Sequence, residues 1–65
     1  MTELRLILKL IDWTSTIVIK DKCTSKPILK CSVYDFRDLD MYKVNCNRKV
    51  KVNRTNLLNT YIIYL

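Results

Sequence analysis

The sequence predicts a small all-β protein, an antiparallel meander or barrel of five to six short strands, with an α+β fold as the alternative. Ile, Val, Thr and Tyr, which favour strands, are abundant, whereas Ala, the strongest helix former, and Gly are absent. Short apolar runs that alternate with polar residues are separated by polar turns. The 65 residues form one domain, and their 49% hydrophobic content suffices for a core of marginal stability.

Residues 3–13 are an apolar run that fits two patterns. Alternating leucines predict a strand, whereas a stripe at helical spacing, with Thr2 as its N-cap, predicts a helix. The stripe consists of Leu4, Ile7, Leu8 and Ile11. We expect a strand, because a turn over residues 12–15 would join it to a second strand over residues 16–22. That hairpin pairs Leu10 with Ile17.

Residues 28–34 are the predicted third strand, which Pro27 can open because proline is tolerated at the first residue of a strand. Its inward side chains are Leu29, Cys31 and Val33, and its outward ones are Lys30 and Ser32.

The acidic segment over residues 35–40 breaks the alternation, so we expect a loop or a single helical turn there. Ser32 or Asp35 would cap it, and Phe36 and Leu39 would fold back on the core. A final apolar strand over residues 57–65 must be covered by neighbouring strands or by a second subunit.

Residues 41–53 carry the main prediction, a β-hairpin with an apolar face and a basic face. A loop of three or five residues pairs Val44 with Val50 and Tyr42 with Val52, so that their side chains all face inward. The opposite face is then basic, and its like charges need water, salt or an anionic partner to offset their repulsion. Lysines that protect an exposed sheet edge are the purely structural alternative. The predicted contacts to an anionic partner are Lys43, Arg48, Lys49, Lys51 and Arg54.

The net charge of +6, from 12 basic and 6 acidic residues, favours nucleic acid or an acidic protein surface as the partner. Aromatic rings between basic side chains can stack on the bases of a single strand. Trp13, in a turn, and Tyr64, near the end of the last strand, are the expected stacking residues. No recognised nucleic-acid-binding or phosphate-loop motif accompanies them.

Catalysis and metal binding are not expected. The sequence has no histidine, so Cys-His and Ser-His-Asp arrangements are impossible. Cys23, Cys31 and Cys46 cannot complete a four-ligand zinc site without a further group, and we expect reduced thiols. The Asp-rich segment is more typical of turns and caps than of a cation site. We predict a protein that is not an enzyme and has no cofactor.

A membrane location is also not expected, because no apolar stretch approaches about 20 residues and no signal peptide is recognisable. We therefore predict a cytoplasmic protein. Lys, Ile and Asn supply 20 of the 65 positions, which is typical of an AT-rich gene and favours a phage or another mobile element.

The predicted function is a non-catalytic module that binds nucleic acid through the cationic hairpin face. The alternative is a protein-interaction module, such as a phage- or mobile-element-encoded inhibitor of a host protein, acting through an edge strand or the apolar final strand. A homodimer whose partner is a second copy is the third interpretation.

Overall fold

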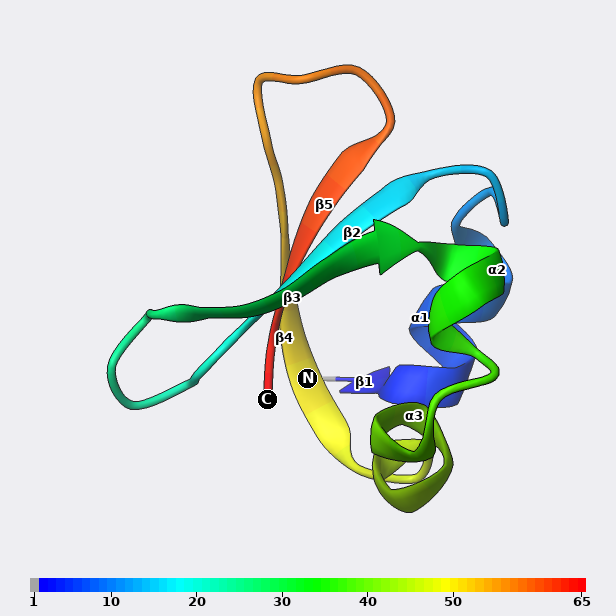
Figure 1. The fold of residues 1–65 in the computed structure, drawn as a ribbon, viewed down its shortest axis with the longest axis vertical. Coiled ribbons are helices and arrows are strands. Elements are labelled where there is room, and N and C mark those ends of the chain that lie inside the picture. The colour runs from blue at the N-terminus through cyan, green and yellow to red at the C-terminus, as the bar shows by residue number, and fades with distance from the viewer. Residues whose placement is uncertain (1) are drawn as a thin grey trace.

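The computed structural model describes residues 2–65, which form a mixed five-stranded sheet and three short helices (Figure 1). The strands are β1 (Thr2–Glu3), β2 (Thr16–Lys20), β3 (Pro27–Ser32), β4 (Lys49–Arg54) and β5 (Thr60–Tyr64). The helices are α1 (Leu4–Leu10), α2 (Val33–Phe36) and α3 (Asp40–Asn45). The chain is therefore mostly β with some α.

The strand order is β1-β4-β5-β2-β3, and β2 pairs with β5 in parallel. The other neighbours, including the β2–β3 and β4–β5 hairpins, are antiparallel. The prediction of a pure meander is wrong, and so is that of a barrel, because the sheet stays open between β1 and β3. Strand β5, which begins at Thr60 rather than at residue 57, is covered by neighbouring strands on both sides.

Residues 4–10 are helical, so the prediction of a strand there is wrong and the helical alternative is confirmed. Leu4, Ile7 and Leu8 are buried in the core, whereas Leu10, off the stripe, is 85% exposed. Glu3, not Thr2, is the N-cap residue. No hairpin pairs Leu10 with Ile17, which lies beside Cys31 and Tyr61 instead (residue pairs of β2 with β3 and β5).

The turn over residues 12–15 is confirmed. The Asp12 carboxylate accepts hydrogen bonds of 2.9 Å from the backbone N–H and from the hydroxyl of Thr14. The Ser32 cap is confirmed too, because its hydroxyl accepts a 3.1 Å bond from the Asp35 N–H at the start of α2. Phe36 is fully buried, as expected, but Leu39 remains 38% exposed.

The hairpin predicted over residues 41–53 is wrong, because its first half is helix α3. Val44 is 81% exposed and faces no strand, while Val50 is 2% exposed. Strand β1 occupies the position beside β4 that the prediction gave to residues 42–44, and Thr2 is opposite Val50. Asp40 in the first turn of α3 and Lys43 in the last turn suit the helix dipole.

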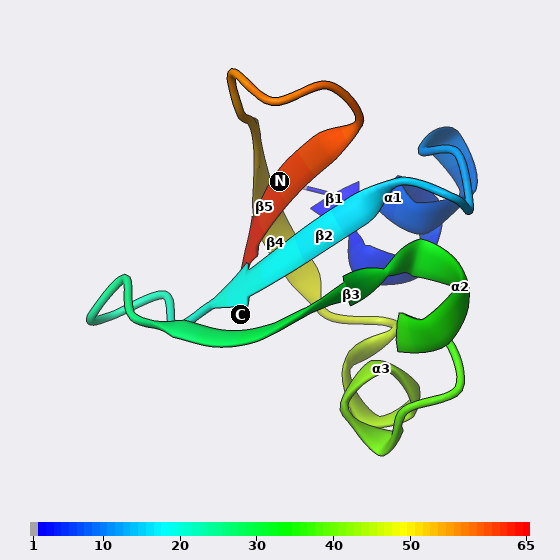
Figure 2. The ribbon, with the colours of Figure 1, turned by 45° about the horizontal axis from the view of Figure 1, so that its top comes forward.

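The core lies on one face of the sheet, between the strands and the helices, which gather on that side in both views (Figures 1 and 2). Its buried residues are Leu4, Ile7, Leu8, Ile17, Ile19, Val33, Phe36, Val50 and Ile63. Met41 and Tyr42 of α3 pack against it. No helix within residues 2–65 has both the length and the apolar character needed to cross a membrane.

Candidate nucleic-acid interface

No helix of residues 2–65 lies over the second face of the sheet (Figure 2). The side chains of this face come from the alternate strand positions. We call it the open face and define it by eight residues. They are Val18, Lys20, Lys30, Lys49, Lys51, Asn53, Ile62 and Tyr64. Each of these side chains keeps some access to solvent, whereas the core-facing Ile17, Ile19 and Ile63 are fully buried.

Strand register aligns the open face into two rows. In the first row Tyr64 lies between Lys51 of β4 and Lys20 of β2, because it pairs with both. Neighbouring strands are about 4.8 Å apart, so two ammonium groups flank one aromatic ring at a span of roughly 10 Å between their backbones. The second row contains Ile62 beside Val18, with Lys30 of β3 beyond. The face is thus an apolar strip edged by lysines and, beside Ile62, by Asn53.

A hollow of about 250 Å³ lies at the end of the first row, lined by Lys22, Ser25, Lys51 and Tyr64. The β2–β3 loop supplies Lys22 and Ser25. The Lys22 N–H donates to the Leu65 carbonyl at 2.9 Å and fixes the loop beside the end of β5.

The loop that carries Ser25 is held in a tight turn by Asp21. The Asp21 carboxylate accepts backbone hydrogen bonds from Cys23 at 2.7 Å and from Thr24 at 3.1 Å. Ser25 adopts a left-handed conformation, with φ of 60°. Asp21, the acidic residue next to Lys20 and Lys22 in the sequence, is thereby bound by the loop's own backbone rather than by a lysine.

The net charge belongs largely to the sheet. Residues 4–15 and 33–48, which form the helical side, carry five basic and four acidic residues. Residues 2–3, 16–32 and 49–65 carry seven basic residues against only Glu3 and Asp21. Five of the six net positive charges therefore lie in the sheet and its loops.

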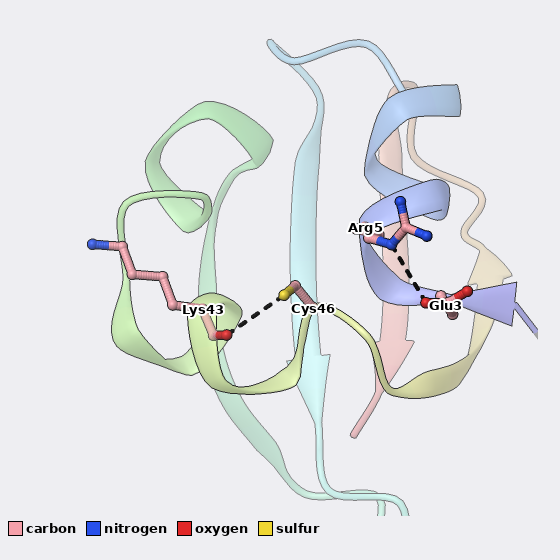
Figure 3. Close-up of polar contacts among 4 residues, drawn as sticks. All are labelled: Glu3, Arg5, Lys43 and Cys46. Atoms are coloured by element: carbon pink, nitrogen blue, oxygen red, sulfur yellow. Dashed lines mark hydrogen bonds and ion pairs between the residues drawn. The ribbon is translucent and has the colours of Figure 1, made fainter.

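Ion pairing does not cancel this charge. Within the described part of the chain, the one pair closer than 4.0 Å joins Arg5 to Glu3, at 3.4 Å (Figure 3). Glu3 is opposite Lys49 in the register and so lies on the same face, but its carboxylate is turned to Arg5. Among residues 2–65, the open-face lysines thus have no carboxylate partner, which suits them to an external anion.

The five predicted contact residues are not brought together. Lys49 and Lys51 lie on the open face, but Arg54 is opposite Tyr61 and its guanidinium lies 6.0 Å from that ring on the core-facing side. Arg48 is in the turn before β4. The Lys43 side chain extends from α3 away from the strands, while its carbonyl accepts a 3.5 Å contact from the Cys46 thiol (Figure 3).

The two predicted stacking residues also separate. Tyr64 joins the open face, beside Lys20 at the end of β2. Trp13 precedes the start of β2, is 59% exposed, and packs on Tyr34 with ring centroids 5.4 Å apart. Trp13 therefore belongs to the helical side.

Sequence reasoning missed Lys20, Lys22 and Ser25. Because side chains alternate along residues 16–20, the Lys20 side chain points away from Ile17 and Ile19. The sequence therefore indicated that Lys20 lies on the face away from the core. That Lys20 flanks Tyr64 follows only from the parallel pairing of β2 with β5, which has no local signature.

The cysteines are free thiols, and Cys31 faces the core beside Ile17. Burial, with a smaller effect of the Asp35 carboxylate, raises the pKa of the Cys31 thiol. No cluster of three or more His, Cys, Asp or Glu side chains in residues 2–65 could hold a metal ion.

Comparison of the chain with protein-family models, with curated proteins and with solved structures finds no match.

Proposed function

We propose that the protein is a non-catalytic nucleic-acid-binding module and that its open face contacts the phosphate backbone. The observation that carries this proposal is the first row of the open face. Tyr64 there lies between Lys51 and Lys20, and no carboxylate of residues 2–65 pairs with either lysine. In this row an aromatic surface lies beside positive charge that no carboxylate neutralises.

Phosphate contacts made by lysine are compatible with this geometry. Lysine is a point charge on a flexible stem, so it follows a backbone without demanding a fixed orientation. Contacts to phosphates position a nucleic acid but carry no sequence information, so we expect similar affinity for different sequences. With about four such contacts, affinity should fall roughly 100-fold between about 50 and 200 mM salt.

The test compares two double variants that remove the same charge on opposite sides of the molecule. Lys30→Gln with Lys51→Gln alters the open face, and Lys9→Gln with Lys43→Gln alters exposed positions on α1 and α3. Binding of a labelled oligonucleotide is measured by fluorescence anisotropy across a salt series. Removing one lysine that binds a phosphate should reduce the slope of log affinity against log salt by about 0.7–0.9.

We expect the open-face pair to flatten the slope by about 1.4–1.8 and the helical pair to leave it unchanged. Circular dichroism melts check that both variants fold. An equal change in the two variants would reduce the effect to net charge and reject the proposed face. Absence of wild-type binding at about 50 mM salt would reject nucleic-acid binding itself.

A second candidate function, a protein-interaction module, is favoured by a separate observation on the helical side. Trp13, Tyr34 and Leu10 are 59%, 58% and 85% exposed, and Trp13 and Tyr34 are in ring contact. Tryptophan and tyrosine are enriched at the energetic centres of protein interfaces. An inhibitor of a host protein would use this patch, so Trp13→Ala should abolish a nuclease-resistant pull-down that the Lys30/Lys51 variant retains.

A further inference from the structure

We infer that the open face takes single-stranded rather than duplex nucleic acid, with one phosphate in the hollow between Lys22 and Lys51 and a base on the Tyr64 ring. This inference rests on the proposed function and adds the class of strand. The observation is that one hollow is lined by two lysines and a tyrosine from three separate segments of the chain.

The polar groups that line the hollow suit an anion. Lys22 and Lys51 provide charged donors, and the hydroxyls of Ser25 and Tyr64 provide neutral ones. No carboxylate lines the hollow, and the nearby Asp21 carboxylate is turned to the backbone N–H groups of its own loop. At about 250 Å³ the hollow is below the range of roughly 300–1,000 Å³ for sites that enclose a drug-sized ligand, so it fits a part of a longer chain.

The aromatic ring decides between the two classes of strand. A base can stack on a tyrosine only if it has left its own stack, which costs a few kcal/mol per base in a duplex and least in a single strand. Ile62 and Val18, in the row beside Tyr64, extend the apolar surface over which a base could lie. A duplex could offer only its phosphates to the same lysines and would gain nothing from the ring.

Arginine-type readout of groove edges has no basis on this face. Its cations within residues 2–65 are all lysines, and the Arg54 guanidinium lies on the core-facing side against Tyr61. Bidentate recognition of guanine, the commonest specific contact in a duplex major groove, is made by arginine or lysine, but only arginine presents its donors as a rigid fork. Phosphate binding combined with stacking is the mode that the open-face side chains can support.

The experiment measures the affinity of the full chain for a short labelled single strand and for the same sequence as a duplex, at one low salt concentration. Tyr64→Leu removes the ring, Tyr64→Phe keeps it, and Tyr34→Leu removes an exposed tyrosine from the helical side as the matched control. Melts by circular dichroism accompany every variant.

We expect the wild type to bind the single strand at least tenfold more tightly than the duplex. Tyr64→Leu should weaken single-strand binding by about 5- to 150-fold, the equivalent of removing one stacked base, and should leave duplex binding unchanged. Tyr34→Leu should bind as the wild type does. Tyr64→Phe keeps the ring but loses the hydroxyl, so it should weaken single-strand binding much less than Tyr64→Leu does. Lys22→Gln should weaken binding of both classes, because it removes a lysine that binds a phosphate.

Equal or tighter duplex binding, or an unchanged single-strand affinity in a folded Tyr64→Leu variant, would overturn this inference. Neither result bears on the proposed function, which is tested separately by whether the Lys30/Lys51 variant flattens the salt slope. Failure of both strands to bind the wild type would overturn the two together. If Tyr64→Leu unfolds, the preference of the wild type for the single strand over the duplex still decides the outcome.

Discussion

Ile62 and Ile63 are consecutive residues of β5, yet they belong to different environments. Ile63 points into the core and is fully buried, whereas Ile62 points to the open face and keeps access to solvent. The difference arises because the helices cover only one side of the sheet (Figure 2). One face of the same strands therefore provides most of the stability, and the other is free to collect lysines that would be too costly to bury.

The largest expected effect on stability comes from substituting the two isoleucines separately. Ile63→Ala should lower the free energy of unfolding by about 2–5 kcal/mol, because it leaves a cavity in the core. Both substitutions lose strand propensity, which is worth about 1 kcal/mol. Ile62→Ala should lower the free energy of unfolding by only this amount, because it leaves no cavity in the core. Urea unfolding followed by circular dichroism measures the difference.

The loss expected for Ile63→Ala is a large part of the stability of a 65-residue domain. If Ile63→Ala does not fold, Ile63→Val replaces it in the test, with an expected loss of roughly 0.5–1.5 kcal/mol. Equal losses at the two positions would break the comparison. They would mean that the open face is covered in solution, as a homodimer through this face would require.

A smaller effect is expected where the chain passes from the sheet to the helical side. The Ser32 hydroxyl caps α2, which carries Val33 and Phe36 onto the core. Ser32→Ala should destabilise the protein by about 1 kcal/mol, and Ser32→Asp should restore most of it, because aspartate also caps helices. Thermal melts of the three proteins measure this. A loss that aspartate does not restore would point to packing rather than capping.

The smallest expected effect is on the pH dependence of stability and concerns Cys31, which faces the core. The raised pKa keeps the Cys31 thiol protonated above roughly pH 8.5, where a thiol in the unfolded chain ionises. The folded protein then binds more protons than the unfolded chain, so the free energy of unfolding falls as the pH rises past that value. Melting temperatures between about pH 8 and 10 should fall more steeply for the wild type than for Cys31→Ala.

The other titrating groups are common to both of these proteins and cancel in the comparison. Cys23, in the exposed β2–β3 loop, provides a further contrast and should react with a thiol reagent before Cys31 does. Parallel pH curves for wild type and Cys31→Ala would show that Cys31 is as accessible as a residue of the open face.

Local chemistry made part of this fold predictable. The Asp12 turn, the Ser32 cap and the inward position of Phe36 depend on residues within a few positions of one another, and the sequence contains all of them. The strand predicted over residues 4–10 is wrong because five of these seven positions are apolar, so both periodicities fit. Residues 41–45 were misassigned because so short a segment satisfies alternation by chance.

The open face was only partly predictable for a different reason. Lys51 and Tyr64 were each expected to contact a partner, but their adjacency depends on which strand lies beside β5. Lys20 completes the row through a parallel pairing of segments more than 40 residues apart in the chain. Such long-range pairings are decided by the packing of the whole domain and not by any local pattern.

The central position of β5 also affects how the molecule is made. Residues 60–64 are translated after every other strand of the sheet, but they insert between β4 and β2. Before β5 is in place, the β1–β4 pair and the β2–β3 hairpin each have an unpaired inner edge, which is prone to aggregation. Completion of the sheet, and with it of the Lys51–Tyr64–Lys20 row, therefore depends on the insertion of β5 between strands from distant parts of the chain.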